Sequence, residues 1–170
     1  MELYLSIYGE LSRLFHQGED EVPRQTSSQA LAYPVTMYTP YPLPDLSRLE
    51  ERRRLSPAAV RAFFNIVKHW EIRDEDARQL LGGISTGAYY ELKKKPDRVL
   101  EQDRLQRISY LIGIFKALNI LYGTRLADRW IQLANTNPIF TGKTPLAYMM
   151  QGGTPAMERV RSLLDARRGG

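Results

Sequence analysis

The sequence contains no cysteine, which excludes disulfides, thiolate zinc sites and cysteine nucleophiles. It has only two histidines, and no spacing of histidine, aspartate and glutamate that is typical of a metal site. It also lacks an apolar run long enough to span a bilayer, and its acidic start, MELYLSIYGELSR, carries no small-residue cleavage site. We therefore expect a cytoplasmic protein with no membrane segment, no metal and no cofactor.

Positive charge is in modest excess. The 24 lysines and arginines outnumber the 19 acidic residues, which gives a net charge of +5 and a pI near 9.5. This excess permits a polyanionic or acidic partner but does not require one. A hydrophobic fraction of 43% over 170 residues is sufficient for one buried core plus an extension.

The first part of the chain, residues 1–55, differs in composition from the rest. Its first apolar residues recur at helical spacing, but some of them also alternate as in a strand. The four prolines of LAYPVTMYTPYPLPDL exclude a regular helix there. The segment is either an extended linker or an arm whose tyrosines dock on the domain or on a partner, and we favour the arm. We assign residues 1–55 to an N-terminal extension.

From Ser56 onward the sequence predicts an all-α fold with one continuous core. SPAAVRAFFNIVKHW has Ser56 in position to be an N-cap and Pro57 at the first helical position. Further helices are bounded by cap or break residues: Asp74, Gly82, Gly83, Ser85, Pro96, Gly123, Thr144 and Thr154. No alternating β-branched run competes with the helical pattern.

The TGKT motif looks like the end of a phosphate-binding loop. Such a loop needs a glycine five positions before the Gly-Lys pair, where this chain has Asn137. A helix rather than a strand precedes the motif, and Pro145 removes a backbone N–H where the loop needs donors. The segment instead predicts a tight connection in which Phe140 enters the core, Gly142 allows a turn and Thr144 caps the next helix.

The stretch EDARQLLGGISTGAYYELKKK fits a helix-turn-helix, whose second helix would lie in the DNA major groove. The candidate DNA-binding residues lie at the start, on the expected exposed face and at the basic end of that helix: Ser85, Thr86, Tyr89, Tyr90, Lys93, Lys94 and Lys95. The lysines would contact phosphates, which adds affinity rather than sequence reading. The alternative is an ordinary helical hairpin with a solvated basic end.

The C-terminal segment MERVRSLLDARRGG predicts an amphipathic helix that carries Arg159, Arg161, Arg167 and Arg168. One interpretation is a solvated face on the last helix. The other is an arginine-rich tip that reaches into a partner, since the planar guanidinium makes several hydrogen bonds in a charged pocket.

From about Arg125 to Leu164 the chain resembles the toxin-binding domain of the MbcA/ParS/Xre antitoxin family. The matching features are a Trp-bearing helix, an Asn-Pro-x-Phe-x-Gly-x-x-Pro-Leu run, a Met-containing helix that ends at glycine, and a closing Val-x-x-x-Leu helix. Upstream, Ser56 to Gly123 is similar to the Xre-type helix-turn-helix half of the same proteins. The resemblance divides the chain into a helix-turn-helix region at 56–123 and a toxin-binding domain at 124–170.

The resemblance implies an antitoxin that binds a RES-domain toxin, an ADP-ribosyltransferase-like enzyme that uses NAD, and blocks its active site. The family often represses its own operon as a dimer, so operator DNA and a homodimer or a hetero-oligomer with the toxin are further expected partners. The toxin-binding residues that we assign on this basis are Trp130, Asn137, Phe140, Gly142, Pro145 and Met149, with Arg161, Arg167 and Arg168 from the last helix.

Two other classes of function remain as alternatives. The basic pI and the hairpin also fit a stand-alone helix-turn-helix regulator of transcription. A small helical enzyme is the third class, but the sequence assembles no catalytic motif, so we predict that the chain is not an enzyme.

Overall fold

The computed structural model describes residues 44–169, and all structural statements refer to this part of the chain. It contains five α-helices and one 3-10 turn: α2 (Leu49–His69), α3 (Asp74–Leu80), α4 (Thr86–Lys94), α5 (Gln102–Trp130), η1 (Pro138–Phe140) and α6 (Pro145–Gly169). No strand occurs in the described range, which confirms the all-α prediction. The expectations for the start of the chain and for most of the proline-rich arm concern residues 1–43, which lie outside it.

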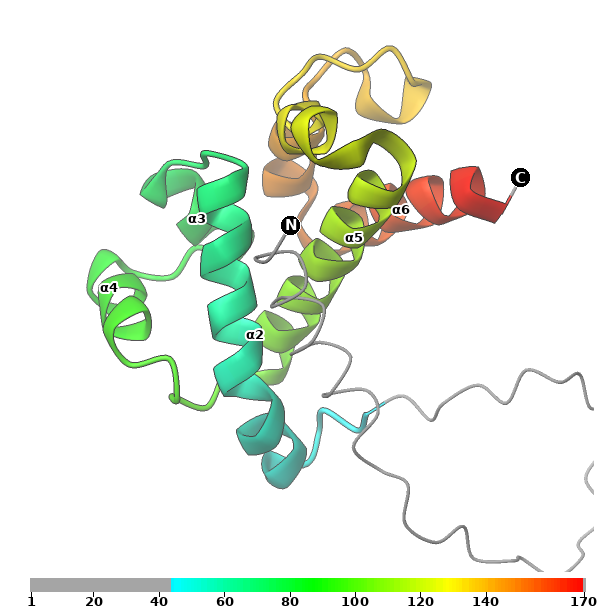
Figure 1. Cartoon of the computed structure of the whole chain (residues 1–170). Coiled ribbons are helices and arrows are strands. Elements are labelled where there is room, and N and C mark those ends of the chain that lie inside the picture. The colour runs from blue at the N-terminus through cyan, green and yellow to red at the C-terminus, as the bar shows by residue number, and fades with distance from the viewer. Residues whose placement is uncertain (1–43, 170) are drawn as a thin grey trace, which may run out of the picture. The chain divides into compact units, whose positions relative to one another are not determined.

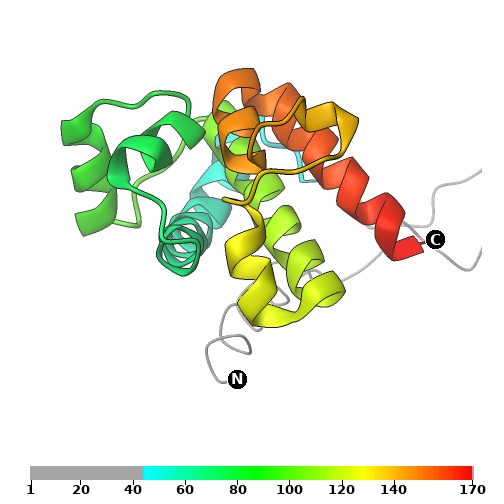
Figure 2. The same ribbon diagram turned by 90° about the horizontal axis from the view of Figure 1, so that it is seen from above.

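One hydrophobic core passes through all five helices, with α5 at its centre. Figures 1 and 2 show α5 running between α2 on one side and α6 on the other. Fully buried side chains of α5 such as Leu111 and Leu118 belong to the same cluster as Phe63 of α2 and Val160 of α6. The helices therefore depend on one shared interior rather than on separate small ones.

The start of α2 differs from the prediction. The helix begins at Leu49, so the assignment of Ser56 as its N-cap is wrong. Ser56 is fully buried inside the helix, where its hydroxyl donates to the carbonyl of Arg52 and accepts from the amide of Leu100 at 2.9 Å. The Ser-Pro pattern misled the prediction because a buried serine that bonds to the segment before α5 looks the same in sequence as a helix cap. Pro57 has no N–H, so the helix lacks one backbone hydrogen bond there.

Other helix ends agree with the local signals. The hydroxyls of Ser85 and Thr144 accept from the amides of Ala88 and Ala147 at 3.2 and 3.1 Å, which confirms both as caps. Asp74 is the first residue of α3 rather than its N-cap, which is Arg73. The capping role predicted for Asp74 is therefore wrong by one position.

Two glycines bend the long helices. α5 bends at Gly123 (φ 69°, ψ 166°) and α6 at Gly153 (φ 61°, ψ −145°). Side chains disfavour both conformations, so glycine permits the bends. The predicted helix boundaries at Gly123 and before Pro155 thus agree with the structure, because each of these glycines separates two helical segments that share one label.

Candidate functional site

The connection between α5 and α6 is a tight turn that bonds to itself. The amide of Asn137 donates to Asn135 Oδ1 at 3.0 Å, and Asn137 Oδ1 accepts from the amide of Ile139 at 3.1 Å. After η1, Thr141 and Gly142 both have positive φ (50° and 80°), and the amide of Lys143 returns to the carbonyl of Phe140 at 2.9 Å. Several backbone amides that a phosphate loop would present to a ligand, those of Ile139, Phe140, Thr141 and Lys143, are thus engaged inside the protein.

Phe140 is the centre of the C-terminal half. Its side chain is fully buried, and its ring meets those of Trp130 and Tyr148 edge-on, at centroid distances of 5.9 and 5.4 Å. Pro145 and Met149 are also buried. These predicted toxin-binding residues therefore shape the domain from within and do not lie on its surface.

The remaining predicted toxin-binding residues lie nearer to solvent. Asn137 is half-buried and Gly142 is exposed, both in the turn described above. Arg161 is half-buried in the interface between α5 and α6, whereas Arg167 and Arg168 are exposed in the last turn of α6. Figure 1 shows this end of α6 projecting from the body of residues 44–169.

Arg161 lies over Gly113 of α5. A Cβ atom built at Gly113 would stand 1.5 Å from Arg161 Nη1 and 2.6 Å from its Cζ, so only glycine leaves room for this guanidinium. Arg161 Nε donates to Asp165 Oδ2, one turn further along α6. The sequence pattern does not reveal this contact, because Gly113 and Arg161 are far apart in the chain and Gly113 simply interrupts a helical pattern.

The two exposed arginines also have partners. Arg168 Nη1 donates to Asp165 Oδ1 at 3.3 Å, and Arg167 Nη1 donates to the hydroxyl of Tyr122 at 2.9 Å. Asp165 thus bridges Arg161 and Arg168, while Tyr122 belongs to α5 just before its bend. The end of α6 is held by contacts at several points.

A shallow groove runs beside α6, where it faces η1. It is lined by Ile139, Pro155, Glu158, Arg159, Ser162 and Leu163. A hydrogen bond with the hydroxyl of Tyr148 raises the pKa of the exposed Arg159, so this side chain stays charged. The groove combines apolar side chains with one charge of each sign, Glu158 and Arg159.

α3 and α4 form the predicted hairpin. The amides of Gly82 and Gly83 bond to the carbonyls of Gln79 and Arg78, both at 2.9 Å, and both glycines have positive φ. This arrangement ends α3 and turns the chain into α4, as the sequence predicted. Figure 2 shows both short helices (green) away from the C-terminal end of α6 (red), while α3 also packs against α6.

Tyr89 is not on the exposed face of α4, so that expectation is wrong. Its ring is fully buried against Phe64, and its hydroxyl donates to Asp74 Oδ1 at 2.9 Å. Tyr90, which is 44% exposed, donates to Asp74 Oδ2 at 3.0 Å. The hydrogen bond from Tyr89 is the main cause that lowers the pKa of Asp74, and burial raises the pKa of Tyr89.

The other candidate DNA-binding residues are exposed: Ser85, Thr86, Lys93, Lys94 and Lys95. Lys93 Nζ lies 3.8 Å from Asp74 Oδ1 and 5.9 Å from the centroid of the Phe64 ring. Lys93 therefore interacts with Asp74 and Phe64 within the protein, whereas Lys94 and Lys95 are more available to a phosphate.

Sequence comparison assigns both halves of the chain. A family model described as the antitoxin Xre-like helix-turn-helix domain matches residues 49–113, and one described as the antitoxin Xre/MbcA/ParS C-terminal toxin-binding domain matches residues 117–170. The chain belongs to the Xre/MbcA/ParS antitoxin family. The assignment confirms the resemblance drawn from the motifs, and it makes the chain an antitoxin with a toxin-binding domain.

The chain is also similar to a curated protein. The uncharacterized protein y4oB of Sinorhizobium fredii is 37% identical over 115 residues, which cover 67% of this chain and 87% of the relative. No solved structure matches the chain. The division that we expected between residues 123 and 124 stays a prediction, and the two family matches meet within α5.

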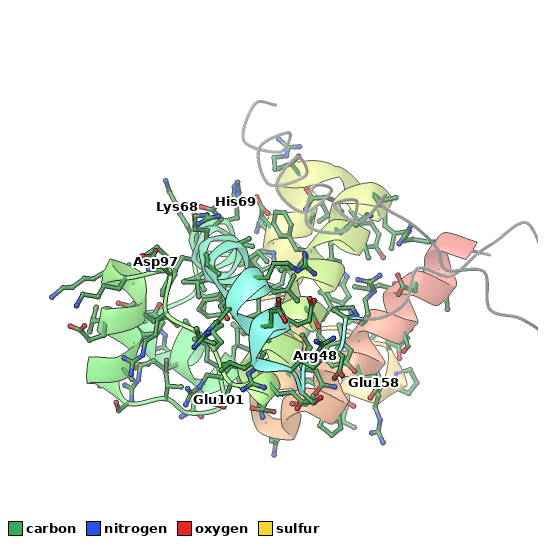
Figure 3. The ribbon with its side chains drawn as sticks, turned by 90° about the horizontal axis from the view of Figure 1, so that it is seen from below. Arg48, Lys68, His69, Asp97, Glu101 and Glu158 are labelled. Carbon is green, nitrogen blue, oxygen red and sulfur yellow. The ribbon has the colours of Figure 1, made fainter. Side chains whose placement is uncertain are left out.

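An acidic residue of the toxin-binding match, Asp128, lies close to a histidine of the helix-turn-helix match, His69. Asp128 Oδ2 is 3.5 Å from Nδ1 of His69, and Figure 3 shows His69 next to Lys68 at the C-terminal end of α2. Burial raises the pKa of Asp128, and the proximity of His69 opposes that shift. No cluster of three or more potential metal ligands occurs in residues 44–169, and no helix in that range is long and apolar enough to cross a membrane.

Proposed function

We propose that this antitoxin binds a RES-type, NAD-using toxin through residues 117–170 and blocks the toxin's active site with the end of α6. The observation that carries the proposal is the pair of exposed arginines, Arg167 and Arg168, in the last turn of that helix. The buried cluster around Phe140 supports it, because this cluster fixes the turn from which α6 starts.

The chemistry of NAD indicates what such a tip has to replace. The cofactor combines a negatively charged diphosphate with a planar, positively charged nicotinamide ring. A guanidinium is also planar and positively charged, and it stacks on aromatic rings and bonds to carboxylates. The arginines therefore match the nicotinamide subsite, whereas a subsite that holds phosphates would repel them.

Docking and blocking are separate tasks in this proposal. Docking requires an apolar surface with a polar rim. The groove beside α6, with Ile139 and Leu163 in its lining and Arg159 at its edge, has this composition. Blocking requires only a narrow projection, and the last turn of α6 provides it. Removal of the tip should therefore spare much of the binding and abolish the protection.

The test co-expresses the antitoxin with a RES-domain toxin, and measures complex formation by pull-down and protection by growth. A chain truncated after Asp165 should still form the complex but should fail to protect. The double variant Arg167→Lys/Arg168→Lys should protect less well than the native chain, because lysine keeps the charge but loses the planar donor group.

The matched control is Arg53→Lys/Arg54→Lys, which makes the same change at two adjacent arginines on the exposed side of α2. It should protect like the native chain. A truncated chain that binds and protects as well as the full one would refute blocking by the tip.

A second candidate function is operator binding, which the open side of α4 favours. Thr86 and Tyr90 are exposed there, and Lys94 and Lys95 follow at its end. We expect Lys94→Glu/Lys95→Glu to weaken binding to a fragment of the antitoxin's own promoter. It should also lower the slope of log K against log salt by about 0.9 for each phosphate that the variant no longer neutralises. If affinity and slope do not change, the hairpin has only a structural role.

A further inference from the structure

We propose that Asp165 is a positioning residue for the two tip arginines, Arg167 and Arg168. It acts together with the hydroxyl of Tyr122 and with a notch in α5, the space left by the missing side chain of Gly113. These groups hold the arginines in place before any toxin is bound. The inference rests on the proposed function of the α6 tip. It goes further by assigning a task to three residues that need not contact the toxin.

The first element of this device is the notch. Gly113 lies in the middle of α5, where glycine weakens a helix relative to alanine. A helix retains such a residue when something must approach its backbone, and here the guanidinium of Arg161 occupies the place of the missing side chain. Arg161 is therefore fixed on α5 and is only 30% exposed along its side chain.

The second element is the carboxylate of Asp165. One oxygen accepts from Arg161 and the other accepts from Arg168, which lies three residues further along α6. Because Arg161 is fixed by the notch, the carboxylate has a fixed place, and it passes that constraint to Arg168. The spacings of four and three residues put all three side chains on one face of the helix.

The third element is Tyr122. Its hydroxyl accepts from Arg167 at 2.9 Å, so the second tip arginine is tied to α5 and not to α6 itself. The two arginines are thus held by different helices. A guanidinium has five N–H donors, so one bond to Asp165 or Tyr122 leaves most donors for a partner.

Such contacts affect binding through entropy. A free arginine loses side-chain freedom when a partner immobilises it, and that loss weakens the complex. Asp165 and Tyr122 restrict the arginines in the free antitoxin, so less freedom is lost on binding. The ion pairs of Asp165 and the hydrogen bond of Tyr122 are partly exposed. Loss of one of them should therefore weaken inhibition by about threefold to tenfold rather than abolish it.

The first experiment needs no toxin. The ordering of the Arg167 and Arg168 side chains is measured by nitrogen relaxation at their Nε atoms in the full chain. Asp165→Asn should make Arg168 more mobile, and Tyr122→Phe should do the same for Arg167. The control Asp97→Asn makes the same change at an exposed aspartate, which Figure 3 places near α4 and away from α6, and should alter neither signal.

The second experiment measures inhibition of NAD consumption by a RES-domain toxin. Asp165→Asn should weaken inhibition about threefold to tenfold with an unchanged melting temperature, and Asp165→Glu should recover part of it. In a chain truncated after Asp165, which should bind the toxin without inhibiting it, the Asp165→Asn change should leave toxin affinity unchanged, because the arginine that it positions is gone.

The outcomes separate the two proposals. Unchanged mobility of Arg168 in Asp165→Asn, or a loss of toxin affinity from the same change in the truncated chain, would overturn the positioning role. If the truncated chain inhibits fully, the proposed function of the tip fails, whereas the relaxation measurement still decides whether Asp165 orders the arginines.

Discussion

Replacing Phe140 with alanine should weaken the C-terminal half of this antitoxin more than most single changes. The side chain is fully buried, between the rings of Trp130 and Tyr148. It also follows the Asn137 turn directly, so the ring anchors the backbone that leads into α6. The change removes the ring and leaves its neighbours facing a cavity.

The expected loss follows from that burial. Replacing a buried phenylalanine with alanine costs about 3–5 kcal/mol, which includes the cavity. The two edge-on ring contacts account for about 0.5–1.5 kcal/mol each within that figure. The free energy of unfolding of a domain of this size is typically about 5–15 kcal/mol, so the variant should still fold but should lose much of that stability. Phe140→Leu keeps most of the apolar volume and should lose less.

Urea unfolding followed by far-UV circular dichroism measures the loss, with the slope of the transition as a check on two-state behaviour. Hydrogen exchange should locate the effect in residues 131–150 first. A loss below about 1 kcal/mol for Phe140→Ala would contradict a buried anchor, because it would be smaller than the range for filled core sites.

Two further predictions concern single residues. Burial raises the pKa of Asp128 above its unfolded value, so its ionisation costs stability as pH rises through the carboxyl range. Asp128→Asn should therefore stabilise the protein at neutral pH, with a gain that shrinks at acid pH in urea titrations. A loss at neutral pH would show that the pair with His69 is net stabilising. Calorimetry with magnesium-ATP should detect no binding, in the native chain or in Lys143→Ala, because Asn137 and Pro145 replace features of a phosphate loop. Binding that disappears in the variant would refute this.

Much of the fold could be predicted because its signals are local. Ser85 and Thr144 cap their helices through hydroxyls that reach amides three residues ahead. Gly123 and Gly153 adopt conformations that side chains disfavour, so their positions reveal the bends. Such features depend on a few neighbouring residues, and a pattern read along the chain contains them.

Other features depend on residues that are distant in the sequence. Ser56 bonds to the amide of Leu100, 44 positions away, so a plausible cap proved to be a buried link between helices. Tyr89 and Tyr90 are adjacent and chemically alike, and only the packing of α4 decides which one is buried. The notch at Gly113 requires the register between α5 and α6, which no local pattern specifies.

The same long-range packing bears on how the two halves of the antitoxin work together. Arg107 of α5 has a side chain that is only 16% exposed and is paired with Asp103 at 2.7 Å. A Cβ at Gly82, in the turn between α3 and α4, would lie 3.3 Å from its Nε, and one at Gly153, in the bend of α6, would lie 3.7 Å from its Nη1. One side chain therefore fills the space between the helix-turn-helix turn and the bend of the toxin-binding helix.

Because glycine leaves no side chain between Arg107 and either turn, we expect a movement of α6 at its bend to shift Arg107 against the α3–α4 turn. α5 adds a second connection, since the two family matches meet within it and both halves pack on its side chains. A flexible linker would let the halves move independently, whereas a shared helix and a shared core do not. We therefore propose that a partner that displaces α6 also disturbs the hairpin, which would couple toxin binding to the candidate DNA-binding surface.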